Sequence, residues 1–172
     1  LNFTLDTGRP NAPALSLLEL DDTGVNSHDG ITRSKNLHIE VSAEAGTSVQ
    51  LFLDGQPAGL QLAGIGIEFL VNNLSEGSHT FTSQTEDAAG NISIFSVPLI
   101  VKVDTQAPRT PEFDLDRISD TRPYGDHTTS LPTVRLAGQT DPLGIIKLLE
   151  TGEIVTADAN GSFAFYPISL EN

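Results

Sequence analysis

Hydrophobic and polar residues alternate along short stretches of this chain, which is the pattern of a β-strand with one buried and one exposed face. The stretches are rich in Val, Ile, Phe, Thr and Leu, and clusters of Gly, Asn, Asp and Ser separate them. No segment keeps a helical period over about 11 residues. The alternation predicts strands over residues 15–20, 36–43, 48–55, 67–74, 78–87 and 93–103. Short strands at this spacing predict an all-β chain built as a β-sandwich.

The chain also repeats itself with a period of about 98 residues. Asp104-Thr105 repeats Asp6-Thr7, and Asp120-Thr121 repeats Asp22-Thr23 at the same spacing. Pro111 repeats Pro13 at the same spacing, and with slips of one or two residues further matches join residues 29–32 to 126–129, Gly55 to Gly152 and residues 67–76 to 163–172. The period is the length of one immunoglobulin-like (Ig-like) sandwich.

The repeat register divides the chain into three parts. Residues 1–5 take the place of the last strand of a preceding repeat, residues 6–103 form a complete repeat, and residues 104–172 form a partial repeat that lacks its last two strands. We therefore expect tandem Ig-like β-sandwiches, one complete and one truncated. The open edge of the truncated repeat predicts strand-swapped self-association, with residues 1–5 of a second molecule as the donor strand.

Charge narrows the classes of partner. The chain has 9 Lys and Arg against 23 Asp and Glu, a net charge of −14, and both repeats are acidic. Nucleic acid and anionic lipid are therefore not expected as partners, whereas cations are. Cysteine is absent, which removes disulfides, thiol catalysis and Cys-type zinc sites. No apolar stretch approaches the ~20 residues of a spanning helix, so no membrane insertion is expected.

Aspartates gather at the two ends of the expected sandwich. Tracing the strands up and down places the 21–32 loop and Asp104 at one end, so that Asp22, Asp29 and Asp104 converge, and it places the 87–91 loop at the other end. Converging carboxylates repel unless a cation joins them, and calcium takes roughly six to eight oxygen ligands. We expect calcium ligands among Asp22, Asp29, Asp104, Asp6, Asp87, Asn91, Asp120 and Asp126. The alternative interpretation is that these are ordinary turn residues.

The sequence carries no catalytic signature. Glu86 and Asp87 are adjacent at a predicted strand end, so their side chains point to opposite faces and cannot flank one bond. The four histidines have no metal-ligand spacing, and no nucleophile elbow accompanies the serines. We therefore do not expect an enzyme.

The linker and loop motifs resemble those of a known family. Residues 104–111, "DTQAPRTP", and residues 74–93, "LSEGSHTFTSQTEDAAGNIS", are similar to the bacterial Ig-like tandem repeats of giant secreted adhesins, which are often exported by type I secretion. The resemblance implies β-sandwich repeats in a long stalk at the cell surface or in a biofilm, with calcium at the junctions between neighbouring repeats. The chain departs from the pattern in "DTGRP" (6–10) and in "SDTRPYGD" (119–126), which lacks a glycine after Asp-Thr.

Three functions remain open at this point. The first is a stalk of spacer repeats that calcium makes rigid. The second is a recognition module for a host-surface or biofilm-matrix ligand, such as a glycan or a protein. Exposed aromatic residues would favour it, but the chain has no Trp and only two Tyr. The third is an accessory Ig-like domain of a secreted enzyme, which has no reason to recur at a fixed period.

Overall fold

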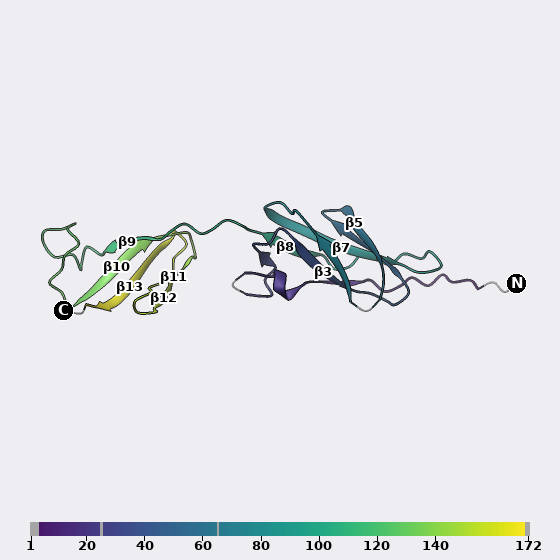
Figure 1. Cartoon of the computed structure of the whole chain (residues 1–172), viewed down its shortest axis with the longest axis horizontal. Helices are drawn as coiled ribbons and strands as arrows, with labels where there is room; N and C mark the ends of the chain where they lie inside the picture. Colours follow the sequence, from purple (N-terminus) through teal and green to yellow (C-terminus); the bar gives the residue numbers. More distant parts are fainter. Residues whose placement is uncertain (1–3, 25, 65, 171–172) are drawn as a thin grey trace. The chain divides into compact units, whose positions relative to one another are not determined.

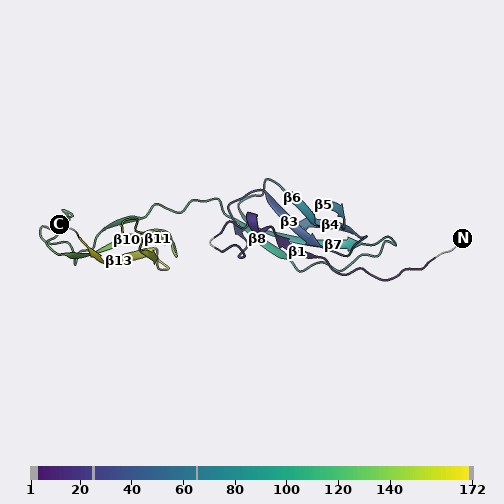
Figure 2. The same cartoon turned by 60° about the horizontal axis from the view of Figure 1, so that its bottom comes forward.

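The structure is a computed structural model that describes residues 4–24, 26–64 and 66–170. The chain divides into two compact units, Leu1–Gln106 and Ala107–Asn172. Figures 1 and 2 draw unit 1 in purple to teal and unit 2 in green to yellow. The boundary between the units lies after Gln106 in the sequence, three residues beyond the boundary after residue 103 that the repeat register gives.

Unit 1 is built from two antiparallel sheets joined as an Ig-like sandwich. A three-stranded sheet has the order β1-β3-β6, and a five-stranded sheet has the order β2-β8-β7-β4-β5, in which only β2 and β8 run parallel. The strands are β1 (Ala14–Leu17), β2 (Ile31–Thr32), β3 (Leu37–Ser42), β4 (Ser48–Leu53), β5 (Gln56–Leu62), β6 (Ile67–Val71), β7 (Gly77–Glu86) and β8 (Leu99–Val103). One 3-10 turn, η1 (Glu19–Asp21), follows β1. The expected all-β sandwich fold is confirmed.

Alternation along the strands places every second side chain in the core of unit 1. In β3, Leu37, Ile39 and Val41 are buried while their neighbours face outward. Phe81 of β7 is fully buried and lies in the middle of the five-stranded sheet, because β7 pairs with both β4 and β8. The core therefore consists of the inward faces of the two sheets, as the hydrophobic pattern predicts.

Unit 2 has its own, smaller core. Its three-stranded sheet has the order β13-β10-β9, and a separate two-stranded sheet pairs β11 with β12. The strands are β9 (Glu112–Leu115), β10 (Thr133–Gln139), β11 (Ile145–Lys147), β12 (Ile154–Thr156) and β13 (Ser162–Ser169). Val134, Ile146, Phe163, Phe165 and Ile168 form the buried cluster between them.

The strands of unit 2 correspond to five strands of unit 1. Ala14 pairs with Ser42 between β1 and β3, and Glu112 pairs with Gln139 between β9 and β10. The chain also leaves the sheet in the same way: Leu74 N donates to Lys35 O at 2.9 Å, and Leu170 N donates to Pro132 O at 3.0 Å. Thus β9, β10, β11, β12 and β13 are the counterparts of β1, β3, β4, β5 and β6.

Several predicted strands are shorter than the alternation suggests, two of them markedly so. The predicted strand 15–20 ends early, because β1 ends at Leu17 and Glu19–Asp21 form η1 instead. The predicted strand 93–103 is regular only as β8, because side chains replace backbone acceptors in its first half. Ser93 Oγ accepts from Thr85 N, and Ser96 Oγ accepts from Ser83 N, each at 3.0 Å.

Candidate cation site

The 21–32 loop meets the end of β8 at one end of unit 1. Gly30 O accepts from Lys102 N, and Thr32 O accepts from Asp104 N, each at 2.7 Å. Gly30 has φ 69°, and a Cβ there would lie 2.8 Å from Ile100 O, so the close approach requires glycine. The backbone therefore brings the loop that carries Asp22 and Asp29 next to Asp104.

Asp22 is the most unusual carboxylate at this end. Only 8% of the residue is exposed. Its Oδ2 accepts from Gly30 N at 3.0 Å, whereas its Oδ1 is buried and has no hydrogen-bond partner among the described residues. A buried polar oxygen without a partner costs roughly 1–3 kcal/mol, and more if it is charged. A cation beside Oδ1 would remove that cost.

Asp120 shows the same pattern in unit 2. Its Oδ2 accepts from Gly125 N, and its Oδ1 is again buried without a partner among the described residues. The threonine that follows each aspartate also has one role: Thr23 Oγ1 accepts from Arg33 N at 2.9 Å, and Thr121 Oγ1 accepts from Ser130 N at 3.1 Å. The two loops are therefore structural repeats. In each of them, one carboxylate oxygen has no hydrogen-bond partner among the described residues.

Asp29 and Asp126 make a second matched pair. Asp29 Oδ1 accepts from Ile31 N, and Asp126 Oδ1 accepts from Thr128 N, each at 3.0 Å. The hydrogen bonds from the Thr128 hydroxyl and backbone hold the pKa of Asp126 below its ordinary value. Asp29 also packs closely on Gly24, since a Cβ at Gly24 would lie 2.9 Å from Asp29 Oδ1. Both aspartates thus stabilise tight turns of their loops.

Asp104 is paired with a lysine. Its Oδ2 lies 3.0 Å from Lys102 Nζ and its Oδ1 accepts from Gln106 N at 3.2 Å. The Lys102 hydrogen bond is the main cause of a lowered pKa of Asp104, while the nearby Glu76 carboxylate opposes it. A cation that takes Asp104 as a ligand would have to displace Lys102.

Glu76 is a neighbour of Asp104 that the sequence did not indicate. Its Oε2 accepts from Thr105 N at 3.0 Å, its Oε1 accepts from the Thr105 hydroxyl, and Lys35 Nζ lies 3.3 Å from Oε1. These Thr105 hydrogen bonds lower the pKa of Glu76. Glu76 therefore anchors the start of the linker, although nothing distinguishes it in the sequence from other turn acids.

The fit of a metal ion can be tested on these contacts. Over residues 4–24, 26–64 and 66–170, no three Asp, Glu or His side chains form a group that could hold a metal. The orphaned oxygens of Asp22 and Asp120 nevertheless suit a hard cation, which accepts carboxylate, carbonyl and water oxygens. Each loop therefore offers a cation one such carboxylate oxygen, and no ready group of acidic ligands surrounds it in the described part of the chain.

The opposite end of unit 1 brings Asp6, Asp87 and Asn91 together. Asn91 Nδ2 donates to Asp87 Oδ2 at 2.9 Å and to Asp6 O at 3.3 Å. Hydrogen bonds from Asn91 are the main cause of a lowered pKa of Asp87. Asp6 itself closes a turn, since its Oδ1 accepts from Gly8 N at 3.0 Å.

Asp87 is explained by turn geometry alone. Its Oδ1 accepts from Ala89 N at 2.8 Å and from Asn91 N at 2.9 Å. Asp158 does the same in unit 2, accepting from Asn160 N at 2.8 Å and from Ser162 N at 2.9 Å, although it lies at a different place in the sandwich. The same five-residue turn recurs where no metal was expected, so the turn needs no cation.

His79 forms a second titratable site, inside unit 1. The residue is 7% exposed, its Nδ1 lies 2.8 Å from Asp54 Oδ2, and its Nε2 lies 2.9 Å from Ser75 O. Asp54 Oδ2 and Ser75 O are both acceptors, so this geometry suits an imidazolium that donates from both ring nitrogens, although the Ser75 hydroxyl also lies 3.4 Å from Nε2. The Asp54 hydrogen bond raises the pKa of His79, and burial opposes it. Hydrogen bonds from Thr80 N and His79 lower the pKa of Asp54.

We expect His79→Gln to destabilise unit 1 by roughly 1.5 kcal/mol in mildly acidic solution and by less at high pH. Because the folded pKa lies above the ordinary 6.5, the stabilisation is complete below pH 6.5 and is lost as pH rises through the folded value. Urea unfolding of both proteins between about pH 5 and pH 9 checks this. His127→Gln, at an exposed ring of unit 2, is the control, and a pH-independent difference between wild type and His79→Gln would contradict the charged pair.

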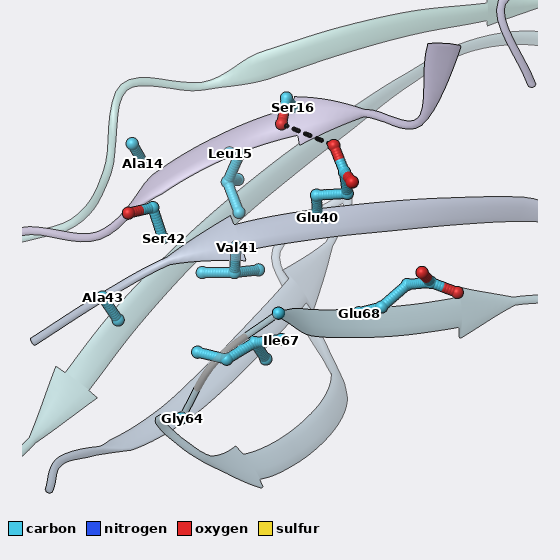
Figure 3. A pocket seen from close by; sticks show the side chains of 11 residues that line it. Ala14, Leu15, Ser16, Glu40, Val41, Ser42, Ala43, Gly64, Ile67 and Glu68 are labelled. Carbon is cyan, nitrogen blue, oxygen red and sulfur yellow. Dashed lines mark hydrogen bonds between the residues drawn. The ribbon is translucent and has the colours of Figure 1, made fainter. Parts of the chain in front are cut away.

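A surface depression of about 520 Å³ offers another binding surface on unit 1. Figure 3 shows that β1, β3 and β6 line it, with Glu40 hydrogen-bonded to Ser16 and with Glu68 nearby. No aromatic residue lines it, so it lacks the stacking surface that sugar recognition commonly uses. The depression therefore gives no particular support to glycan binding.

Comparison with known proteins places the fold. The sequence profile of the bacterial Ig-like domain family matches residues 9–105, which is more than half of the chain. No curated protein sequence matches. No helix in the described part of the chain is long and apolar enough to cross a membrane.

Two solved structures are similar over most of this chain. One is described as a tetra-tandem repeat in the extending region of a large adhesion protein; it is 18% identical, with a TM-score of 0.33, over 92% of this chain and 41% of that chain. The other, described as giving insight into host cell surface retention of a 1.5-MDa bacterial ice-binding adhesin, is 16% identical, with a TM-score of 0.35, over 91% of this chain and 53% of that chain. This chain thus spans about half or less of either solved chain. The family match over residues 9–105 shows that the chain belongs to the bacterial Ig-like domain family.

Proposed function

We propose that the chain is a stretch of stalk from a large secreted bacterial adhesin, in which calcium stiffens the connections between repeats. The role is structural and not catalytic. The observation that carries the proposal is the pair of buried oxygens, Asp22 Oδ1 and Asp120 Oδ1, that lack a hydrogen-bond partner among the described residues at equivalent positions of two successive repeats. The adhesin assignment follows the resemblance of the linker and loop motifs.

Calcium would act where the loop and the linker meet in unit 1. Asp22 and Asp29 lie on the loop, Asp104 begins the linker, and backbone hydrogen bonds already join the two segments. Without a cation, a short linker between small domains permits wide relative motion. A cation held by both segments would restrict the linker at its start, and the same arrangement at Asp120 would serve the next connection.

The chemistry suits an extracellular setting. The net charge of −14 raises the local concentration of cations, and a chain without cysteine cannot use disulfides as an alternative constraint. Extracellular calcium modules bind with dissociation constants of about 10⁻⁴–10⁻³ M, so a medium with millimolar calcium would fill such sites. The proposed location is therefore the cell surface.

Small-angle X-ray scattering tests the stiffening. We expect calcium to narrow the distribution of sizes that the wild-type chain samples, and we expect Asp104→Ala in calcium to resemble the wild type in chelator. Circular dichroism should show that both units of the variant remain folded. A wild-type response to calcium in Asp104→Ala would contradict the role given to Asp104.

Lys102→Ala is the matched control for this experiment. Lys102 Nζ lies 3.0 Å from Asp104 Oδ2, so Asp104→Ala removes this ion pair as well as a candidate calcium ligand. If Asp104 acts through calcium, Lys102→Ala should keep the calcium response. If Lys102→Ala instead behaves like Asp104→Ala, the ion pair and not calcium restrains the linker.

A further inference from the structure

The loop that joins β9 to β10 in unit 2 (Figure 1) concentrates positive charge on an otherwise acidic chain. Arg117 and Arg122 lie on this loop, and their Cζ atoms lie 5.5 Å and 5.4 Å from the centroid of the Tyr124 ring. Neither arginine forms an ion pair among the described residues, whereas Arg135 on β10 pairs with Asp116 at 3.3 Å. The tyrosine ring therefore gathers two positive charges that no ion pair in the described part of the chain neutralises.

Hydrogen bonds fix the segment between the two arginines. Ser119 is buried, and its Oγ accepts from Arg135 N on β10 at 2.8 Å. Thr121 Oγ1 accepts from Ser130 N at 3.1 Å, which ties the first half of the loop to its second half. Because both anchored residues lie between the arginines in the sequence, the two charges are held near one place before any ligand arrives.

The two arginines and the tyrosine line one hollow at the surface of unit 2. The hollow measures about 620 Å³, and Ile118, Leu131, Thr121 and Asp120 complete its lining. Sites for small ligands commonly measure roughly 300–1,000 Å³. Tyr124 is 54% exposed, so much of the residue remains accessible beside the two guanidinium groups. The hollow thus offers a ligand positive charge, aromatic surface and aliphatic surface together.

The equivalent loop of unit 1 does not carry these arginines. Three residues before the repeated aspartate, unit 1 has Glu19 where unit 2 has Arg117. Directly after the repeated Asp-Thr pair, unit 1 has Gly24 where unit 2 has Arg122. The two loops nevertheless share the hydrogen bond that the threonine hydroxyl accepts from the other side of the loop. This shared hydrogen bond therefore does not depend on the arginines, which leaves them free for a ligand.

We propose that this hollow binds a sugar unit that carries a single carboxylate, such as a hexuronic acid. A guanidinium group presents a planar pair of donors that matches a carboxylate. The exposed Tyr124 ring offers apolar surface on which the C–H groups of a pyranose can pack, and Ile118 and Leu131 add aliphatic contacts. The site gives unit 2 a binding role that is separate from the stiffening of the stalk.

Other anions match the hollow less well. A nucleic acid or a highly sulphated glycan brings many negative charges, and the net charge of −14 on the chain opposes its approach. Inorganic phosphate would use the guanidinium groups but would leave the tyrosine ring without a contact. A sugar unit with one carboxylate uses both kinds of group and adds only one negative charge.

NMR titration of the whole chain with the methyl glycoside of glucuronic acid tests the proposal. The matched ligands are methyl glucoside, which has the same ring without the carboxylate, and acetate, which has the carboxylate without the ring. We expect the glucuronide to shift the Tyr124 ring signals and to bind about tenfold more tightly than either matched ligand, because it alone engages both the arginines and the ring. Chelator is present throughout, so the result does not depend on calcium at Asp120.

Arg122→Gln is expected to weaken glucuronide binding by about tenfold, because it removes charge-assisted hydrogen bonds to the carboxylate. Arg33→Gln is the matched control, since it removes the same charge from an exposed position beside the equivalent loop of unit 1, and it should leave binding unchanged. Backbone signals of β10 and β13 should be the same in both variants and the wild type, which shows that unit 2 stays folded.

Each of the following results would contradict a sugar-acid site. Equal affinity for the glucuronide and acetate would mean that the hollow recognises a carboxylate alone, as a peptide could supply. Equal affinity for the glucuronide and the glucoside would mean that the arginines take no part in binding. The absence of any shift at Tyr124, or equal weakening by Arg122→Gln and Arg33→Gln, would mean that this loop does not bind the ligand.

Discussion

Replacing Phe81 by alanine is expected to lower the free energy of unfolding of unit 1 by about 3–5 kcal/mol, the usual cost of truncating a buried aromatic residue. Phe81 is fully buried, and its strand joins two neighbours: Phe81 pairs with Leu53 on β4 and with Leu99 on β8. The cavity left by the ring would lie between the two sheets, where the rigid pairing on both sides prevents collapse.

Urea unfolding of wild type and Phe81→Ala measures this loss. Phe95→Ala is the matched control, because Phe95 is 52% exposed and has an edge-on contact with Phe52 at a centroid distance of 5.5 Å. We expect the control to cost roughly 0.5–1.5 kcal/mol. Equal losses in the two variants would show that Phe81 does not hold the sandwich together.

In saturating calcium, Asp22→Asn is expected to lose the whole stabilisation that calcium gives to unit 1. That stabilisation is about 2.7 kcal/mol when calcium is at 100 times its dissociation constant. The amide keeps an acceptor for Gly30 N but offers calcium a weaker, neutral ligand. Glu19→Gln removes the same charge from an exposed position three residues away, so it should keep the full calcium response.

In chelator, the effect of Asp22→Asn on the free energy of unfolding is not expected to be destabilising. Asp22 Oδ1 is then a buried oxygen without a partner in the part of the chain that the structure describes, and replacing the carboxylate by an amide removes an uncompensated charge. We expect Asp22→Asn to be as stable as the wild type or more stable in chelator, by urea unfolding of both proteins. If Asp22→Asn is instead destabilised equally with and without calcium, Asp22 has a purely structural role in the loop.

The sequence was sufficient for the fold because alternation and repetition can both be recognised without knowing any contact between side chains. The alternation in residues 36–43 predicts β3 closely, and the 98-residue spacing of Asp22 and Asp120 pairs two loops that the structure shows to be equivalent. The strand β5 had no such signal, since its residues are almost all exposed and include a proline and a glycine. Pairing with β4 imposes its strand conformation.

The hydrophobic pattern could not predict where side-chain hydroxyls act as hydrogen-bond acceptors in place of backbone carbonyls. Residues 93–103 alternate well enough to predict one strand, yet Ser93 and Ser96 accept from β7 through their hydroxyls and the chain leaves regular pairing until Leu99. A hydroxyl that competes with a backbone carbonyl cannot be read from hydrophobic periodicity.

The candidate calcium ligands can be distinguished from turn residues only when their hydrogen bonds are known. Asp, Asn and Gly are typical of turns, so sequence alone gives Asp22 and Asp87 the same weight. The structure shows that backbone amides of its turn donate to Asp87, whereas one buried oxygen of Asp22 has no hydrogen-bond partner among the described residues. It also shows a hydrogen bond from Thr105 N to the Glu76 carboxylate. These residues are far apart in the sequence, and no sequence motif predicts the contact.

Thermal unfolding of the wild-type chain in excess chelator and in saturating calcium tests the central claim most directly. A stabilisation of about 2.7 kcal/mol in a domain of this size corresponds to a rise in Tm of roughly 10 °C or more. We predict such a rise on calcium addition, together with its absence in the Asp22→Asn, Asp120→Asn double variant. The same Tm in chelator and in calcium would contradict the claim that calcium binds at the orphaned aspartates of the two repeats.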